Sequence, residues 1–183
     1  MMAINGMSYS SRASAFSNSA IIVTCHTDDY GSTDALAGIE FQKDMERKAF
    51  NAGGGRWEVP AQNLTDFLRG RVSGNLNKNS FVMGAVAADM REIFPKFVSE
   101  ALMAAFSAWE KDYPLFVSHH AILLGAETRT SAPIRIKRDE KYESVNIKNL
   151  YPIGEGSGYT GGIMSSAVDA IKAVESRVSI GDS

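Results

Sequence analysis

The stretch LYPIGEGSGYTGGIMSSAVDAIKAV, residues 150–174, joins a short apolar run, a glycine-rich loop and a periodic segment. The apolar residues 150–153 predict the end of a buried strand. After the loop, apolar residues recur at helical spacing, which predicts a helix that starts near Gly161 or Gly162. These apolar residues are Ile163, Met164, Ala167, Val168, Ile171, Val174 and Val178.

The loop itself contains Gly154, Gly156, Gly158, Gly161 and Gly162. Since glycine has no Cβ atom to shield the backbone N–H, a ligand can approach the main chain closely there. At the start of a helix, unpaired N–H groups and the positive end of the helix dipole face the same point. The stretch therefore predicts a site for a phosphate group or for the oxygen-rich edge of a cofactor.

The glycine spacing is a weak match to the dinucleotide fingerprint. Gly156, Gly158 and Gly161 satisfy G-x-G-x-x-G. A Rossmann fingerprint also requires an acidic residue about 20 residues later, on a second strand, and it belongs at the start of a domain. Here the loop lies close to the C-terminal end of the sequence, so the pattern indicates a different kind of cofactor contact.

Four other runs accompany this stretch: NGMSYSSRASAFSNSAIIV at 5–23, LAGIEFQKDMERKAF at 36–50, VPAQNLTDFL at 59–68 and ETRTSAPIRI at 127–136. Together they resemble the C-terminal part of the uncharacterised FAD-dependent dehydrogenases, also called NAD/FAD-utilising dehydrogenases, among the glutathione-reductase-like flavoproteins. The resemblance covers essentially the whole chain. It implies that Glu155 meets the ribityl chain of FAD and that the helix starting at Gly161, Gly162 and Ile163 points at the isoalloxazine. The cofactor-binding residues that it implies are Gly154, Glu155, Gly156, Gly158, Tyr159, Gly161, Gly162, Ile163, Thr128 and Arg129.

A second polar segment, Glu127, Thr128 and Arg129, directly follows the predicted strand 121–126. Functional loops commonly occupy such positions, and in the resembled family this motif lies near the flavin. The guanidinium of Arg129 could stabilise a reduced, anionic flavin or bind a substrate carboxylate, which makes it the candidate catalytic residue. A structural ion pair of Arg129 with Glu127 or Glu155 is the alternative, and the sequence leaves both open.

Members of the resembled family carry an N-terminal strand and GxGxxG turn that hold the ADP half of FAD, and this sequence shows no such segment. We therefore expect a C-terminal fragment of an FAD-dependent oxidoreductase that supplies the flavin and ribityl side of the site and a substrate-side helical region. Alone it is expected to be inactive and without FAD. Its expected partners are the missing N-terminal FAD-binding segment, a small-molecule substrate and a second copy, through an exposed face. The alternative is a free-standing, non-enzymatic domain that binds a nucleotide or phosphate or mediates interactions.

The order of elements predicts an α+β fold with a helical insertion between strands that would belong to an α/β FAD-binding domain. Strands are predicted at 20–25, 121–126, 134–137 and 150–153. Helices are predicted at 35–51, with Asp34 as N-cap and Gly53 to Gly55 as the stop, and at 85–109, broken at Pro95. The predicted divisions are 1–33, the N-terminal loop and strand of the cofactor domain; 34–116, the helical insertion; and 117–183, the C-terminal strands, glycine loop and helix.

Composition excludes several other classes. The 183 residues are 44% hydrophobic and 22% charged, which suits a globular domain, and the net charge of −2 argues against a nucleic-acid binder. No apolar run approaches the length of a membrane span and no signal peptide is recognisable, so the cytoplasm is the expected location. The single cysteine, Cys25, cannot form an internal disulfide. Neither Cys25 with His26 nor the pair His119 and His120 has a further ligand at metal-binding spacing. No metal site is expected.

Overall fold

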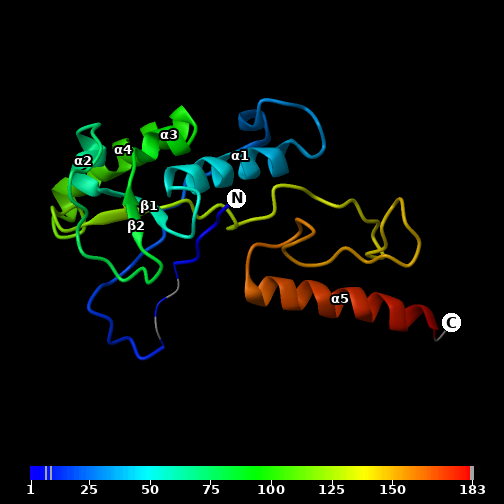
Figure 1. Ribbon diagram of the computed structural model, residues 1–183. Helices are drawn as coiled ribbons and strands as arrows, with labels where there is room; N and C mark the ends of the chain where they lie inside the picture. The colour runs from blue at the N-terminus through cyan, green and yellow to red at the C-terminus, as the bar shows by residue number, and fades with distance from the viewer. Residues whose placement is uncertain (7, 9, 182–183) are drawn as a thin grey trace. The chain divides into compact units, whose positions relative to one another are not determined.

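The computed structural model describes residues 1–6, 8 and 10–181 (Figure 1). The chain divides into two compact units. The first contains residues 1–29 and 41–128, and the second contains residues 30–40 and 129–183. A short 3-10 helix, Thr27–Tyr30, and the first turn of helix α1, Ala37–Ala52, lie where the chain passes between the units.

The first unit is built on a three-stranded sheet of order β2-β1-β3. Strand β1, Val59–Asn63, pairs in parallel with β2, Ala85–Ala87, and antiparallel with β3, Ile122–Leu124. The helices α2, Leu64–Leu68, α3, Met90–Ile93, and α4, Lys96–Asp112, lie together on one side of these strands in Figure 1. The mixed sheet with its helices confirms the predicted α+β class.

The hydrophobic core belongs to this first unit. Strand β1 is buried along its whole length, and Phe67 of α2 and Phe106 of α4 are both almost completely buried. Their rings meet edge to face with centroids 6.4 Å apart, and Phe106 makes a similar contact with Trp109 at 5.8 Å. The buried Gln62 satisfies its amide group by accepting a hydrogen bond from the Met90 N–H at 2.9 Å and donating to the Arg71 carbonyl at 2.8 Å.

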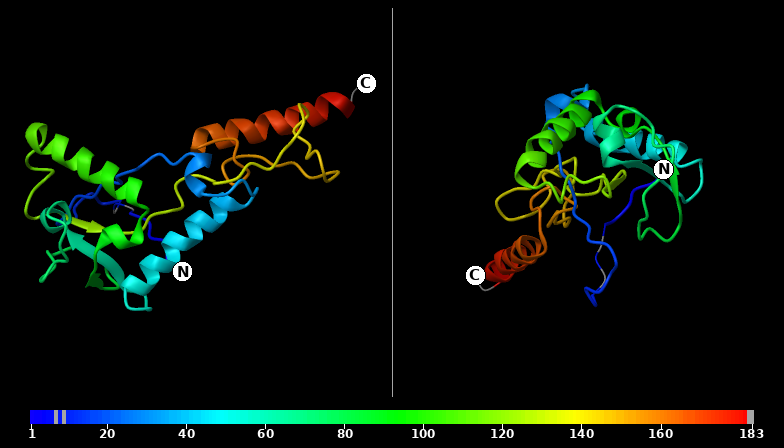
Figure 2. Two further views of the ribbon diagram at one scale, coloured as in Figure 1. Left: turned by 90° about the horizontal axis from the view of Figure 1, so that it is seen from above. Right: turned by 90° about the vertical axis from the view of Figure 1, so that its left-hand side faces the viewer.

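The second unit contains little regular structure beyond helix α5, Ile163–Gly181. Figure 2 shows this helix preceded by a long irregular excursion of the chain, drawn in yellow and orange. Within the excursion, a single β-bridge joins Arg138 and Ser144. The buried hydrophobic residues that the structure describes in this unit are Ala37 and Ala173 alone. Hydrophobic burial is therefore a minor part of what holds the unit together.

Several local predictions are confirmed. Helix α1 is present at the predicted place but begins at Ala37, so Asp34 is not its N-cap; the Asp34 carboxylate accepts the Leu36 N–H at 2.7 Å in the turn before the helix. The helix ends at the predicted glycines, where the Gly55 N–H bonds the Phe50 carbonyl at 2.9 Å. Pro95 separates α3 from α4 as expected, because its ring cannot continue a helix.

Other local predictions are wrong. Residues 85–87 form strand β2 instead of the start of a helix, because their main chain pairs with β1. Residues 20–25 form no strand: the half-buried Ile21, Val23 and Cys25 alternate with exposed neighbours, but no strand lies beside them. Residues 134–137 and 150–153 are likewise not strands. The division at 33/34 and 116/117 stays a prediction, since it refers to the domains of a longer protein.

Candidate cofactor site in the glycine loop

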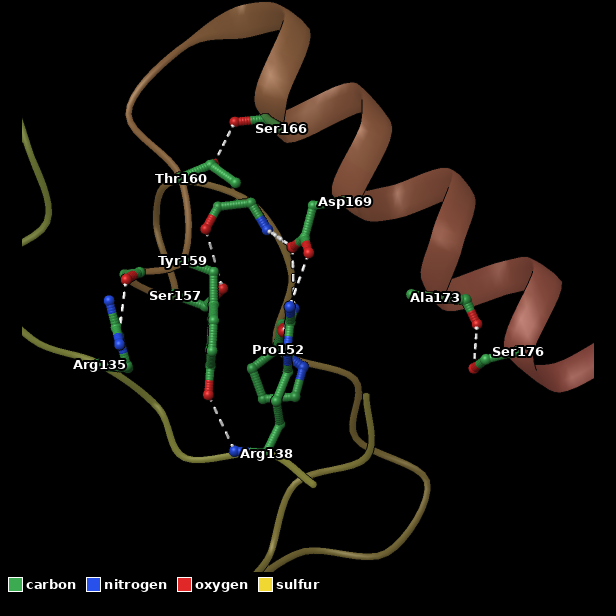
Figure 3. A network of polar contacts seen from close by, with 12 residues as sticks. Arg135, Arg138, Pro152, Ser157, Tyr159, Thr160, Ser166, Asp169, Ala173 and Ser176 are labelled. Atoms are coloured by element: carbon green, nitrogen blue, oxygen red, sulfur yellow. Dashed lines mark hydrogen bonds and ion pairs between the residues drawn. The ribbon is translucent and has the colours of Figure 1, made fainter. Parts of the chain in front are cut away.

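The glycine loop in front of α5 is a closed turn with its own hydrogen bonds (Figure 3). The Gly158 N–H donates to the Glu155 carbonyl at 2.8 Å, and the Tyr159 N–H donates to the Gly154 carbonyl at 3.2 Å. The buried Ser157 hydroxyl also donates to the Gly154 carbonyl, at 3.1 Å. The predicted loop is therefore an ordered turn whose conformation is set by local bonds.

Two of the five glycines are required by this turn. Gly154 and Gly158 have φ angles of +73° and +83°, which side-chain-bearing residues rarely adopt. At Gly158 a Cβ atom would also stand 2.1 Å from the Ile134 carbonyl oxygen. The close approach arises because residues 134–136 run against the loop, where the Ile136 N–H donates to the Ser157 carbonyl at 3.1 Å.

Two other glycines are not required by the fold. A Cβ atom at Gly156 or Gly161 would meet nothing within 4 Å, and neither residue has a positive φ. At Gly162 a Cβ atom would make only an ordinary contact, 3.6 Å from the Ser165 hydroxyl. A side chain would therefore fit in the protein at these positions. The close approach of a ligand to the main chain is one physical reason for glycine where the fold supplies none.

Gly161 and Gly162 directly precede the N-terminus of α5, and Gly156 lies in the turn before them. The Gly162 carbonyl accepts the first helical bond, from the Ser166 N–H at 2.9 Å. Because the first N–H groups of a helix lack intrahelical acceptors, those of Ile163, Met164 and Ser165 are available to a ligand. The positive end of the helix dipole favours negative charge or oxygen atoms at the same place.

A buried ion pair fixes the loop to the helix. Asp169, on the first half of α5, accepts two hydrogen bonds from the Arg138 guanidinium, at 2.7 and 2.9 Å. The same carboxylate accepts the Gly154 N–H at 2.9 Å. Arg138 also donates to the Pro152 carbonyl at 2.7 Å. Both side chains of the pair are only 10% exposed. Through these bonds, one buried network joins the chain before the loop, the loop itself and α5.

Two aromatic rings lie against the Arg138 guanidinium. Its central carbon lies 3.7 Å from the Tyr159 ring centroid and 4.3 Å from that of Tyr142. The Tyr159 hydroxyl accepts a hydrogen bond from the backbone N–H of Arg138 at 3.1 Å. The hydrogen bonds from Arg138 lower the pKa of Asp169 most, burial opposes this, and the bond from the Gly154 N–H lowers it further, to about 2. The hydrogen bonds between the two side chains also raise the pKa of Arg138. The pair is therefore fully ionised at neutral pH.

The remaining predicted site residues lie at the junction between the units. Thr128 belongs to the first unit, where its hydroxyl donates to the buried Glu46 carboxylate at 2.8 Å and its carbonyl accepts the Gln42 amide at 2.9 Å. Arg129 is exposed and belongs to the second unit with the glycine loop. The structure thus brings Arg129 and the loop into one unit, and the approach of Thr128 to the loop stays a prediction.

Sequence reasoning missed Arg138 and Asp169. A recognisable signal was the spacing of Ser166, Asp169, Ala173 and Ser176, which places small and polar residues on one face of α5. The apolar residues whose spacing predicted the helix are exposed. Among the described residues, no group of three His, Cys, Asp or Glu side chains is arranged to hold a metal ion. None of the described helices has the length and apolar character to cross a membrane.

The fold and the loop define a class: an α+β protein in which a glycine-rich turn leads into the N-terminus of a long helix. A family model described as "FAD-dependent protein, C-terminal domain-like" matches residues 1–130. The chain belongs to this family, which relates it to the C-terminal part of FAD-dependent proteins.

A longer protein is similar to most of this chain. An uncharacterized protein of Clostridium beijerinckii is 42% identical over 173 residues, covering 93% of this chain and 32% of that protein. The chain thus spans about a third of the length of this relative. The family match ends at residue 130, before the glycine loop. The relative aligns with 93% of this chain, which leaves fewer residues unaligned than follow the loop. The similarity therefore extends through the loop.

Proposed function

We propose that this chain supplies the flavin and ribityl side of an FAD site in an oxidoreductase, a dehydrogenase related to the glutathione-reductase-like flavoproteins. The observation that carries the proposal is the pair of open glycines, Gly161 just before the N-terminus of α5 and Gly156 in the turn that precedes it. In the proposed site, the N–H groups of Gly161, Gly162 and Ile163 face the isoalloxazine. FAD supplies the redox chemistry, and the protein supplies orientation and electrostatics.

Two side chains have proposed roles beside this main-chain surface. Glu155 is half-buried in the loop and would accept hydrogen bonds from ribityl hydroxyls. The exposed Arg129 would stabilise negative charge on the reduced flavin or bind a substrate carboxylate. The carboxylate of Asp169 does not oppose such charge, because Arg138 neutralises it at hydrogen-bond distance.

The exposed face of α5 supports a partner for the chain. Six apolar side chains along the helix are between 44% and 90% exposed: Ile163, Met164, Val168, Ile171, Val174 and Val178. Contiguous apolar surface of this kind marks an interaction site. The proposed occupant is the N-terminal FAD-binding segment of a longer parent protein, and a second copy of the chain is the alternative. Without that segment the chain would bind FAD weakly and be inactive.

The first unit would form the substrate side of the parent protein. Its helices α3 and α4 direct Ile93, Val98 and Phe106 into the core. Any substrate contact would therefore come from its polar edges and loops, not from this apolar stripe. The substrate is a small molecule in this proposal, and the proposed location is the cytoplasm.

A chimera tests the FAD proposal. This chain replaces the matching third of the Clostridium beijerinckii relative, and the FAD released on denaturation is measured per mole of purified protein. The expected result is a yellow chimera with FAD content near that of the unmodified relative. A relative that folds without FAD, or a folded chimera that lacks FAD while the relative contains it, would refute the proposal.

Matched glycine variants test the loop itself. Gly161→Leu in the chimera should lower FAD affinity at least about tenfold, because the new side chain occupies the space given to the ligand. Gly74→Leu is the control, since Gly74 is also an exposed glycine with nothing within 4 Å of a Cβ position, but it lies in the first unit. Equal affinity in both variants would exclude the loop as the contact. Binding of ADP or phosphate to the chain alone, as tight as FAD, would favour the nucleotide- or phosphate-binding alternative.

A further inference from the structure

The Asp169 carboxylate contacts both Gly154 of the glycine loop and Arg138, which also bonds the chain before the loop (Figure 3). One oxygen accepts both the Gly154 N–H and an Arg138 N–H, each at 2.9 Å, and the other oxygen accepts a second Arg138 N–H at 2.7 Å. The side chain is 10% exposed, so it is shielded from water and from direct contact with a bulky ligand. Whatever it contributes to binding must act through the loop.

The opposite end of the loop is tied to the same helix. The hydroxyls of Thr160 and Ser166 are hydrogen-bonded at 2.7 Å, and Ser166 lies one helical turn before Asp169 on α5. Between Gly154 and Thr160, the turn is closed by its own bonds, so its two ends determine where Gly156 stands relative to the helix N-terminus. Breaking the bond at Gly154 would free one of these ends without removing any group that faces the open glycines.

We propose that Asp169 is a positioning residue for the cofactor: through the Gly154 N–H it holds the glycine loop in register with the N-terminus of α5. This inference rests on the proposed FAD function. Arg138 aligns the carboxylate, because its bidentate bonds and the rings of Tyr142 and Tyr159 leave one orientation. Residues that orient metal ligands in this way are typically worth about 10-fold to 100-fold in affinity or activity, and we expect an effect of the same order here.

Two paired substitutions separate positioning from simple structural support. In Arg138→Gln with Asp169→Asn, both charges disappear but an amide oxygen remains to accept the Gly154 N–H. In Arg138→Met with Asp169→Leu, the buried pair becomes apolar, which is often tolerated in stability, and the acceptor is lost. The single change Asp169→Asn serves only as a reference, because it leaves the buried Arg138 charge unpaired.

Two measurements are made on each pair. Amide hydrogen exchange in the chain itself should show Gly154 protected in the Gln and Asn pair and at least about tenfold less protected in the Met and Leu pair. In the chimera, the first pair should keep FAD affinity within about threefold, and the second should lose about 10-fold to 100-fold at comparable melting temperature. Lys48→Gln with Asp44→Asn, an exposed ion pair of α1, is the control and should change neither quantity.

The outcomes are distinguishable. Equal FAD affinity for two equally stable pairs, or an unchanged Gly154 exchange rate in the Met and Leu pair, would overturn the positioning role. An unmodified chimera that lacks FAD would instead overturn the proposed function, and the exchange measurement on the chain would still decide whether Asp169 holds the loop. If the Met and Leu pair fails to fold, Asp169→Leu with Arg138→Leu repeats the same comparison.

Discussion

Gly158 and Gly156 are two residues apart in one loop, yet alanine should have opposite effects at the two positions. At Gly158, alanine must adopt a φ of +83°, which costs about 1–2 kcal/mol for a residue with a Cβ atom. That atom would also stand 2.1 Å from the Ile134 oxygen and 2.9 Å from the Arg135 Cα. Relieving a backbone clash of this kind adds about 1–3 kcal/mol, so the turn should lose about 2–5 kcal/mol.

Gly156→Ala is the matched change. Its Cβ atom meets nothing within 4 Å, and the backbone conformation is open to any residue. We expect the turn to be unchanged or stabilised by about 0.4–1 kcal/mol, because alanine reduces the entropy of the unfolded chain.

Hydrogen exchange of the Tyr159 N–H reports the turn directly, since this group donates to the Gly154 carbonyl. A loss of 2 kcal/mol should accelerate its exchange by about 30-fold in Gly158→Ala, while Gly156→Ala should leave it unchanged or slower. Equal protection in both variants would show that the contact with residues 134–135 does not constrain the loop. Equal loss in both would show that Gly156 is also required by the fold, and would remove the main support for a ligand there.

Three further predictions follow from other contacts. Phe67→Ala should lower the free energy of unfolding of the first unit by about 3–5 kcal/mol, because it empties a fully buried site against Phe106; urea unfolding followed by Trp fluorescence measures this. The pKa of Asp169 is lowered in the folded chain from 3.8 to about 2, so its stabilisation is complete above about pH 4 and disappears as the pH falls through 2; this acid-dependent loss, followed by α5 amide exchange, should be absent from Asp169→Asn. Ile171→Lys with Val174→Glu should reduce ANS binding and self-association of the chain, measured by fluorescence and size-exclusion chromatography, and a wild-type-like result would exclude the α5 face as the associating surface.

Features that depend on neighbouring residues could be predicted from the sequence. The helix stop at Gly53 to Gly55, the break at Pro95 and the start of α5 after Gly162 each follow from the backbone chemistry of one or two residues. Strand β2 was missed because Ala85, Val86 and Ala87 continue the apolar spacing of the following helices, and only pairing with β1 reveals them as a strand.

The sequence predicted the place of the candidate site but not the side-chain contacts that hold it together. The glycine loop and the helix N-terminus are visible in the sequence because both are local, but the sequence did not separate the open glycines from those that the turn requires. The ion pair of Arg138 and Asp169 joins residues 31 apart, so the polar face of α5 that contains Asp169 gave no sign of which residue Asp169 contacts. The covering of α5 could not be predicted for a related reason: hydrophobic periodicity identifies an apolar face, but it does not tell whether this chain or another segment covers that face.

The second unit is held by a charged hydrogen-bond network and has few buried apolar side chains of its own. Heat-capacity change and denaturant dependence scale with the apolar and total surface that unfolding exposes. Opening of this unit should therefore have a small heat-capacity change and a shallow urea dependence, in contrast to the first unit. Covering the apolar face of α5 would reverse this: association should carry a negative heat-capacity change and make the opening of the unit steeper in urea. Calorimetry would thus recognise the correct partner before any activity is known.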